Sequence, residues 1–111
     1  MQGKSLWRLL RGDTPAHEHR PDVLSEYLNA MPWISDNHQA FASMLRDRQY
    51  KIVSDHVSDG GELYDMVNDP GERYNLWDDP AYSDVRFRMV KRLCDRIALT
   101  CDPLPPRLAN Y

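Results

Sequence analysis

The chain has 111 residues, of which 28% are charged and 41% hydrophobic, and its net charge at pH 7 is −3. This length suits one domain with a single modest core, and the slightly acidic balance gives no global attraction to nucleic acid or to an anionic membrane. No stretch reaches the ~20 consecutive apolar residues that a transmembrane helix needs. The basic start, MQGKSLWRLLRG, lacks the apolar segment and cleavage site of a signal peptide. We therefore expect one domain over residues 1–111, and its compartment stays unknown.

The first predicted element is a short helix over residues 5–12, SLWRLLRG. Ser5 can cap its start and Gly12 can end it. Three leucines between them form an apolar stripe: Leu6, Leu9 and Leu10. The next segment, DTPAHEHRPD, is polar and contains two prolines, so we expect a loop there.

About four short strands are predicted in the middle of the chain. The first is VLSEYLNA (23–30), and the second and third form a hairpin in AFASMLRDRQYKIVSD (40–55), where β-forming runs flank a polar turn at 46–49. SDGG (58–61) predicts a tight turn before the fourth strand, ELYD (62–65). Because these strands follow one another locally, the sheet should be antiparallel.

The last predicted element is a long helix from Ser83 to about Thr100. Its apolar residues recur as one helical face: Val85, Met89, Val90, Leu93, Cys94, Ile97 and Ala98. Ser83 is the expected N-cap, with Asp84 well placed for the helix dipole, and Asp102-Pro103 should stop the helix. These elements predict an α+β fold, in which a small antiparallel sheet packs against a long C-terminal helix and a short N-terminal helix precedes it.

The passage between sheet and helix, GELYDMVNDPGERYNLW (61–77), is rich in both turn-forming and aromatic residues. Asn68-Asp69-Pro70-Gly71 predicts a turn, because Pro70 presets φ and Gly71 tolerates a positive φ. Three apolar residues should then anchor the connection on the core: Tyr74, Leu76 and Trp77. The passage therefore reads as a packed connector, and nothing in it demands catalysis.

The order of these motifs resembles the C-terminal subdomain of bacterial sulfatases of the alkaline-phosphatase superfamily. GELYDMVNDPGERYNLWDDP is similar to the strand, Asn-Asp-Pro-type turn and Asn-Leu pair that precede the terminal helix of the family. QGKSLWRLLRGD resembles the passage that closes the catalytic domain, so residues 1–12 would be the end of that domain. LSEYLN and MLRDRQYKIV resemble the first strand and the hairpin of the subdomain.

The resemblance implies sulfuric ester hydrolysis in the intact family, by a formylglycine made from Cys-x-Pro-x-Arg and a bound Ca²⁺. Both belong to the catalytic domain of the family, upstream of the matched region. The nearest match here is Cys101-Asp102-Pro103-Leu104-Pro105, which has Pro105 in place of the required arginine. We therefore assign no catalytic, cofactor-binding or metal-binding residue to this chain and expect it to be non-catalytic by itself. The spacing of Cys94 and Cys101 suits neither a zinc site nor a disulfide scaffold, so we expect a reduced structural pair.

A metal site is one alternative. His17 and His19 flank Glu18, and this spacing can chelate a metal on a strand, where both histidines point the same way. His38 or His56 would have to complete the site. The segment is loop-like and no second ligand pair has suitable spacing, so we favour a solvated loop.

Three further patterns are also better explained by structure. A basic stripe on the terminal helix could suggest nucleic acid, but acidic residues outnumber basic ones 17 to 14 and the stripe is typical of a solvated helix face. The stripe consists of Arg86, Arg88, Lys91, Arg92 and Arg96. The acidic residues of the connector lack the spacing of a Ca²⁺ loop: Asp65, Asp69, Asp78 and Asp79. Ser54, Asp55 and His56 are strand neighbours, whose side chains alternate between faces and form no catalytic relay.

Two hypotheses for function remain. In the first, the chain is the C-terminal subdomain of a sulfatase-like hydrolase and completes the fold and cleft wall of a catalytic domain. In the second, it is an independent α+β module for protein–protein contacts. The first predicts uncovered apolar surface and hence self-association, as a two-fold dimer, or binding to a sulfatase catalytic domain. The candidate residues for that surface are Leu6, Trp7, Leu9, Leu10, Trp33 and Phe41.

Overall fold

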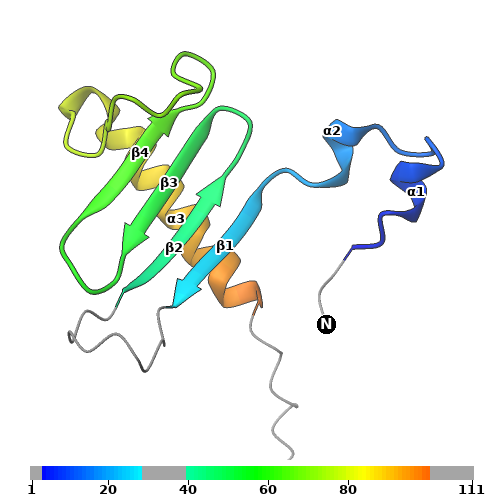
Figure 1. Ribbon diagram of the computed structural model, residues 1–111, viewed down its shortest axis with the longest axis horizontal. Coiled ribbons are helices and arrows are strands. Elements are labelled where there is room, and N and C mark those ends of the chain that lie inside the picture. Colours follow the sequence, from blue (N-terminus) through cyan, green and yellow to red (C-terminus); the bar gives the residue numbers. More distant parts are fainter. Residues whose placement is uncertain (1–3, 29–39, 101–111) are drawn as a thin grey trace, which may run out of the picture.

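The computed structural model describes residues 4–28 and 40–100 and forms two layers, a four-stranded antiparallel sheet and one long helix that crosses one of its faces (Figure 1). The elements are α1 (Trp7–Leu10), α2 (Ala16–His19), β1 (Val23–Leu28), β2 (Phe41–Arg46), β3 (Tyr50–Asp55), β4 (Gly61–Asp65), the 3₁₀ turn η1 (Pro80–Tyr82) and α3 (Ser83–Thr100). The strands lie in the order β1-β2-β3-β4, so each pairs with its neighbour in sequence. The predicted α+β class and antiparallel sheet are confirmed. No helix of the described residues is long and apolar enough to cross a membrane.

The core lies between α3 and the face of strands β2, β3 and β4 that the helix covers. The strand register places Leu45 opposite Ile52 and Ile52 opposite Leu63, and all three side chains are fully buried. Met89 and Leu93 of α3 cover this row and are buried as well. Alternation along the strands thus supplies one apolar face, and the helical period supplies its cover.

The predicted apolar face of α3 is confirmed only in its centre. Val85, Val90 and Ile97 pack beside the core and are half-buried, whereas Cys94 and Ala98 are exposed. A helix on a small sheet buries a narrow stripe, and each of the two exposed residues follows a stripe residue by one position, which turns it away by about 100°. Cys94 is a free thiol, as predicted, but the prediction of a structural role is wrong because it is exposed. Cys101 and the Asp102-Pro103 stop lie outside the described residues.

The N-terminal segment extends to one side of the sheet, beyond the start of β1 (Figure 1). The predicted first helix is present but short: the Ser5 hydroxyl accepts from the Trp7 amide at 3.2 Å, and Gly12 ends the segment at φ +77°. The loop predicted for DTPAHEHRPD is wrong in part, because residues 16–19 form α2. Pro15 sets the helical entrance, and its carbonyl accepts from the Glu18 amide at 3.0 Å.

The predicted span of the long helix is confirmed, since α3 runs from Ser83 to Thr100, but its predicted N-cap is wrong. Ser83 has helical dihedral angles (φ −58°, ψ −41°) and is not the N-cap. Asp79 is the cap instead, because its carboxylate accepts from the Ala81 amide at 2.9 Å and Pro80 occupies the first helical position. The Asp-Pro pair therefore starts η1, which continues directly into α3.

Candidate functional site

The connector after β4 seals the edge of the sheet. The Asn75 side chain accepts from the Leu63 amide through Oδ1 and donates to the Gly61 carbonyl through Nδ2, both at 3.0 Å. The Leu76 amide donates to the Leu63 carbonyl at 2.8 Å. The Asn75 side chain and the Leu76 amide thus occupy the outer backbone groups of Gly61 and Leu63, which a fifth strand would otherwise bond.

Trp77 closes the same edge from the helix side. A Cβ atom at Gly61 would lie 2.4 Å from the Trp77 ring, so only glycine allows the indole to lie this close to the strand. The guanidinium of Arg86 lies 5.5 Å from the centre of the Trp77 ring and donates to the Trp77 carbonyl at 2.5 Å. The helix therefore holds the end of the connector in place.

The turn inside the connector rests on two aspartates. Oδ1 of Asp65 accepts from the amides of residues 67 and 68 at 3.0 and 3.1 Å, and Oδ2 of Asp69 accepts from those of residues 73 and 74 at 2.7 and 2.9 Å. The positive φ predicted at Gly71 is found instead at Glu72, at 54°, where an ion pair of 2.6 Å to Lys51 holds the side chain. Leu76 and Trp77 pack on the core as predicted, but the Tyr74 anchor is wrong: its side chain is 72% exposed. Asp69 ties the Tyr74 amide into the turn, so the chain reaches the sheet only at Asn75.

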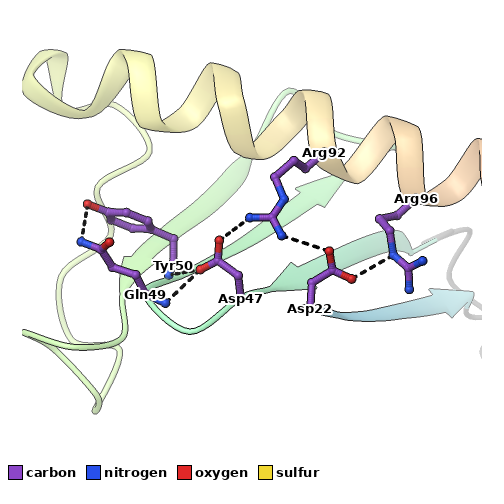
Figure 2. Close-up of polar contacts among 6 residues, drawn as sticks. All are labelled: Asp22, Asp47, Gln49, Tyr50, Arg92 and Arg96. Carbon is purple, nitrogen blue, oxygen red and sulfur yellow. Dashed lines mark hydrogen bonds and ion pairs between the residues drawn. The ribbon is translucent and has the colours of Figure 1, made fainter. Parts of the chain in front are cut away.

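A second polar cluster lies at the end of the sheet where β1 begins and β2 ends (Figure 2). Arg92 of α3 donates to Oδ2 of Asp47 at 2.5 Å and to Oδ2 of Asp22 at 3.0 Å. Nε of Arg96 lies 2.9 Å from Oδ1 of Asp22, in an ion pair whose angle is not that of a hydrogen bond. Asp22 is buried, and these two arginines neutralise it. This charged cluster, Asp22, Asp47, Arg92 and Arg96, clamps the C-terminal half of α3 to the sheet.

The turn between β2 and β3 is part of the same cluster. Oδ1 of Asp47 accepts from the amides of Gln49 and Tyr50, at 2.9 and 2.7 Å, and the Gln49 amide group donates to the Tyr50 hydroxyl at 3.0 Å (Figure 2). Burial, reinforced by the nearby Asp65 carboxylate, raises the pKa of Tyr50. A pocket of about 450 Å³ opens beside this turn and is lined by Glu18, Pro21, Asp47, Arg48, Gln49 and Arg92.

The structure does not bring the candidate metal-binding histidines of the described residues into one cluster. The described residues contain no group of three or more histidines, cysteines or acidic residues that could hold a metal ion. His38 and the side chain of His17 are outside what the structure describes. His56 stacks its ring on Phe41 at 4.7 Å, and its Nε2 lies 2.9 Å from the Ser43 hydroxyl, a fully buried group.

The remaining candidates are used structurally. Asp55 accepts from the Val57 amide and the Ser58 hydroxyl, so it does not face His56 in a relay; the Ser58 bond lowers the pKa of Asp55. Of the connector aspartates, Asp65 and Asp69 hold the turn, Asp79 caps η1, and the exposed Asp78 forms an ion pair of 3.9 Å with Arg86. Of the basic stripe on α3, Lys91 pairs with Asp95 at 2.6 Å, while Arg92 and Arg96 hold the charged cluster.

Sequence reasoning missed Asp22 and Asp47 as partners, although a signal was present. The register pairs Val23 with Arg46, so the residue before β1 and the residue after β2 meet at the same end of the sheet. Two aspartates at these positions, opposite arginines one helical turn apart, predict a clamp once the hairpin order is known.

Comparison with known proteins identifies the family. Residues 1–98 match the family model described as N-sulphoglucosamine sulphohydrolase, C-terminal. The chain belongs to this family. It therefore has the C-terminal domain of sulfatases, as the motif order predicts. A comparison with curated proteins gave no significant match.

Solved structures of sulfatases share the fold. A protein from Bacteroides thetaiotaomicron VPI-5482 that is assigned as a sulfatase matches with 35% identity and a TM-score of 0.75, over 88% of this chain and 20% of that protein. BT1596, a 2-O GAG sulfatase, matches with 35% identity and a TM-score of 0.74 over the same shares. BT4656, solved with D-glucosamine-2-N,6-O-disulfate, has 23% identity and a TM-score of 0.70, over 87% of this chain and 19% of that protein, and shows the shared fold. The chain thus spans about a fifth of the sulfatases that it matches.

Proposed function

We propose that the chain serves as the C-terminal domain of a sulfuric ester hydrolase of the alkaline-phosphatase superfamily. In this role it completes the fold and one wall of the substrate cleft, and the nucleophile and metal ligands come from the catalytic domain. The observation that carries the proposal is the 35% identity to sulfatases along 88% of the chain. The 111 residues contain no Cys-x-Pro-x-Arg motif, which supports a non-catalytic role.

The substrate class we propose is a sulfated carbohydrate. The family is described by N-sulphoglucosamine sulphohydrolase, and one relative at 35% identity is a 2-O GAG sulfatase. Both descriptions name sulfate on a sugar. In this proposal, the catalytic domain determines which sulfate of the sugar is cleaved.

The surface that we propose for docking to a catalytic domain is the apolar side of α1. Leu6, Trp7 and Leu10 are 55%, 63% and 78% exposed. Phe41 is 37% exposed, Leu9 is half-buried, and Trp33 lies outside the described residues. Three large exposed apolar side chains, two on a four-residue helix and one on the residue before it, are costly in water and favour a partner.

For the isolated chain we propose a two-fold dimer through β1. This strand lies at the edge of the sheet, and in the described residues nothing pairs with its outer side. An antiparallel pair centred on Ser25 places Val23 of one copy opposite Tyr27 of the other, a β-branched and aromatic pair of the kind that stabilises sheets. Both side chains are more than half exposed, at 56% and 59%.

A domain exchange tests the proposed function. In BT1596, the C-terminal domain is replaced by this chain, and release of sulfate from the substrate of BT1596 is measured. A matched control carries the C-terminal domain of BT4656, which shares the fold and is 23% identical to this chain. We expect both chimeras to fold and to retain activity, and the enzyme without any C-terminal domain to lose it.

The proposal fails if the control chimera is active while the chimera with this chain is soluble, monodisperse and inactive. That result favours the alternative, an independent protein–protein interaction module. The alternative draws on the same exposed α1 surface, but it has no observation of its own that points to a partner.

A further inference from the structure

We propose an oxyanion-binding site for the sulfate group of a sulfated carbohydrate, formed by Lys4, Arg20 and Arg96. The choice of sulfate among oxyanions rests on the proposed function. The site itself rests on a pocket of about 160 Å³ between the N-terminal segment and α3, which these three residues line together with Pro21 and Asp22.

The charges in this pocket are unbalanced. Asp22 is its only acidic lining residue, and it is already engaged by Arg92 and Arg96. Lys4 and Arg20 are exposed and make no ion pair or side-chain hydrogen bond to any of the described residues. Three cations thus surround one neutralised carboxylate, which leaves a net positive pocket in a chain of net charge −3.

Arg96 is oriented for a ligand. Its Nε faces Asp22, and among the residues drawn in Figure 2 the contact with Asp22 is made by this nitrogen and not by the two outer nitrogens. Neither outer nitrogen bonds to any residue of ranges 4–28 or 40–100. The ion pair therefore fixes the guanidinium plane and leaves a donor pair free, the arrangement in which arginine binds planar or tetrahedral oxyanions.

Adjoining pockets give room for the sugar that would carry the sulfate. Arg20 and Arg96 also line a pocket of about 300 Å³, with Val23, Leu24 and Thr100. Pro21 is shared with the 450 Å³ pocket that contains Arg48 and Arg92. Leu24 offers an apolar contact for a sugar ring in this second pocket, and Arg20 and Arg96, which line both pockets, lie where the ring would join its sulfate group.

Calorimetric titration of the full 111-residue chain tests this site, with a heparin-derived tetrasaccharide, the desulfated tetrasaccharide and inorganic sulfate as probes. The double variant Lys4→Ala/Arg20→Ala removes two free cations and leaves the Asp22 ion pairs intact. The matched control, Arg8→Ala/Arg46→Ala, removes the same charge from exposed positions elsewhere on the described surface.

We expect the wild-type chain to bind the sulfated tetrasaccharide, the Lys4/Arg20 variant to bind at least about tenfold more weakly, and the control to stay within about threefold. If inorganic sulfate also binds and the same variant weakens it, the recognised ligand is the free oxyanion. If only the tetrasaccharide binds, the ligand is the glycan sulfate.

Three results overturn the site: no binding by the wild type, equal weakening in both double variants, or equal binding of the desulfated sugar. The readout needs no catalytic domain. Specific binding together with an inactive chimera would refute the proposed function alone, and an active chimera without binding would refute the site alone.

Discussion

The two edge strands of the sheet, β4 and β1, differ in whether other residues bond to their outer sides. At β4, the connector covers the edge: Asn75 and Leu76 bond to the strand, and Trp77 lies over Gly61. At β1, no described residue takes up the outer hydrogen bonds. An open edge invites pairing with another chain. The β4 edge is thus covered within this domain, and we propose the β1 side, with the apolar α1 next to it in sequence, as the place where a partner binds.

The largest loss of stability is expected from a substitution that disrupts the covered edge of β4. Gly61→Ala places a methyl group against the Trp77 ring, and the free energy of unfolding should fall by about 3 kcal/mol in urea denaturation. Gly60→Ala is the matched control, because its nearest atom is the Ser58 hydroxyl at 3.2 Å, a contact that a shift of a few tenths of an ångström relieves. Equal losses in the two variants would contradict the role assigned to Trp77.

Asn75→Ala opens the same edge through its hydrogen bonds. The amides of Leu63 and Trp77 and the Gly61 carbonyl lose their partner, which should cost about 2 kcal/mol and raise the amide exchange rate in β4. Asn75→Asp keeps the acceptor for both amides and should lose less. If exchange in β4 stayed as slow as in the wild type, the edge would not depend on this side chain.

Acid should loosen the sealed edge before the rest of the sheet. Burial alone would raise the pKa of Asp65, but hydrogen bonds from the side chain and backbone of Asn68 and from the Val67 amide outweigh it, so its pKa is lowered from 3.8. A lowered pKa in the folded state means that the carboxylate stabilises the fold above pH ~4 and that this stability is lost as the pH falls through the folded pKa. Hydrogen exchange in β4 should therefore speed up below pH ~4.

Asp65→Asn removes this titration, and Asp59→Asn, at an exposed position in the turn before β4, is its control. The acid dependence of exchange in β4 should disappear in the first variant and persist in the second. At alkaline pH the sign reverses for Tyr50: its raised pKa means that stability falls as the pH rises above ~10. Constant stability across both ranges would contradict these pKa directions.

The smallest effect on stability is expected at the open edge. Tyr27→Lys places a charge on the exposed face of β1, which should change the free energy of unfolding by no more than about 0.5 kcal/mol while it shifts the dimer toward monomer. Tyr74→Lys, at a residue 72% exposed in the connector, should leave the dimer intact. Loss of the dimer in both variants, or in neither, would place the contact elsewhere.

Sequence patterns predict the elements of this fold better than their contacts. The hairpin around residues 46–49 and the span of α3 follow from β-propensity and helical period, which are local properties of the chain. The bonds of Asn75 to β4 do not follow from these local properties, because the sequence places Asn75 in a loop and does not show which strand lies beside it. Glu72 shows the same limit: this connector residue combines a positive φ with an ion pair to Lys51 of β3, which is distant in sequence. The clamp of Asp22 and Asp47 on α3 likewise joins residues far apart in sequence, such as Asp22 and Arg92, which are 70 positions apart.

The most direct test of the central claim is light scattering on a size-exclusion peak of the isolated chain, with hydrolysis of 4-nitrophenyl sulfate assayed on the same peak with added Ca²⁺. We predict a dimer or larger species with no turnover, because the open edge and α1 bind partners while the catalytic groups of the family lie in another domain. A monomer at high concentration that hydrolyses the sulfate ester would contradict the account.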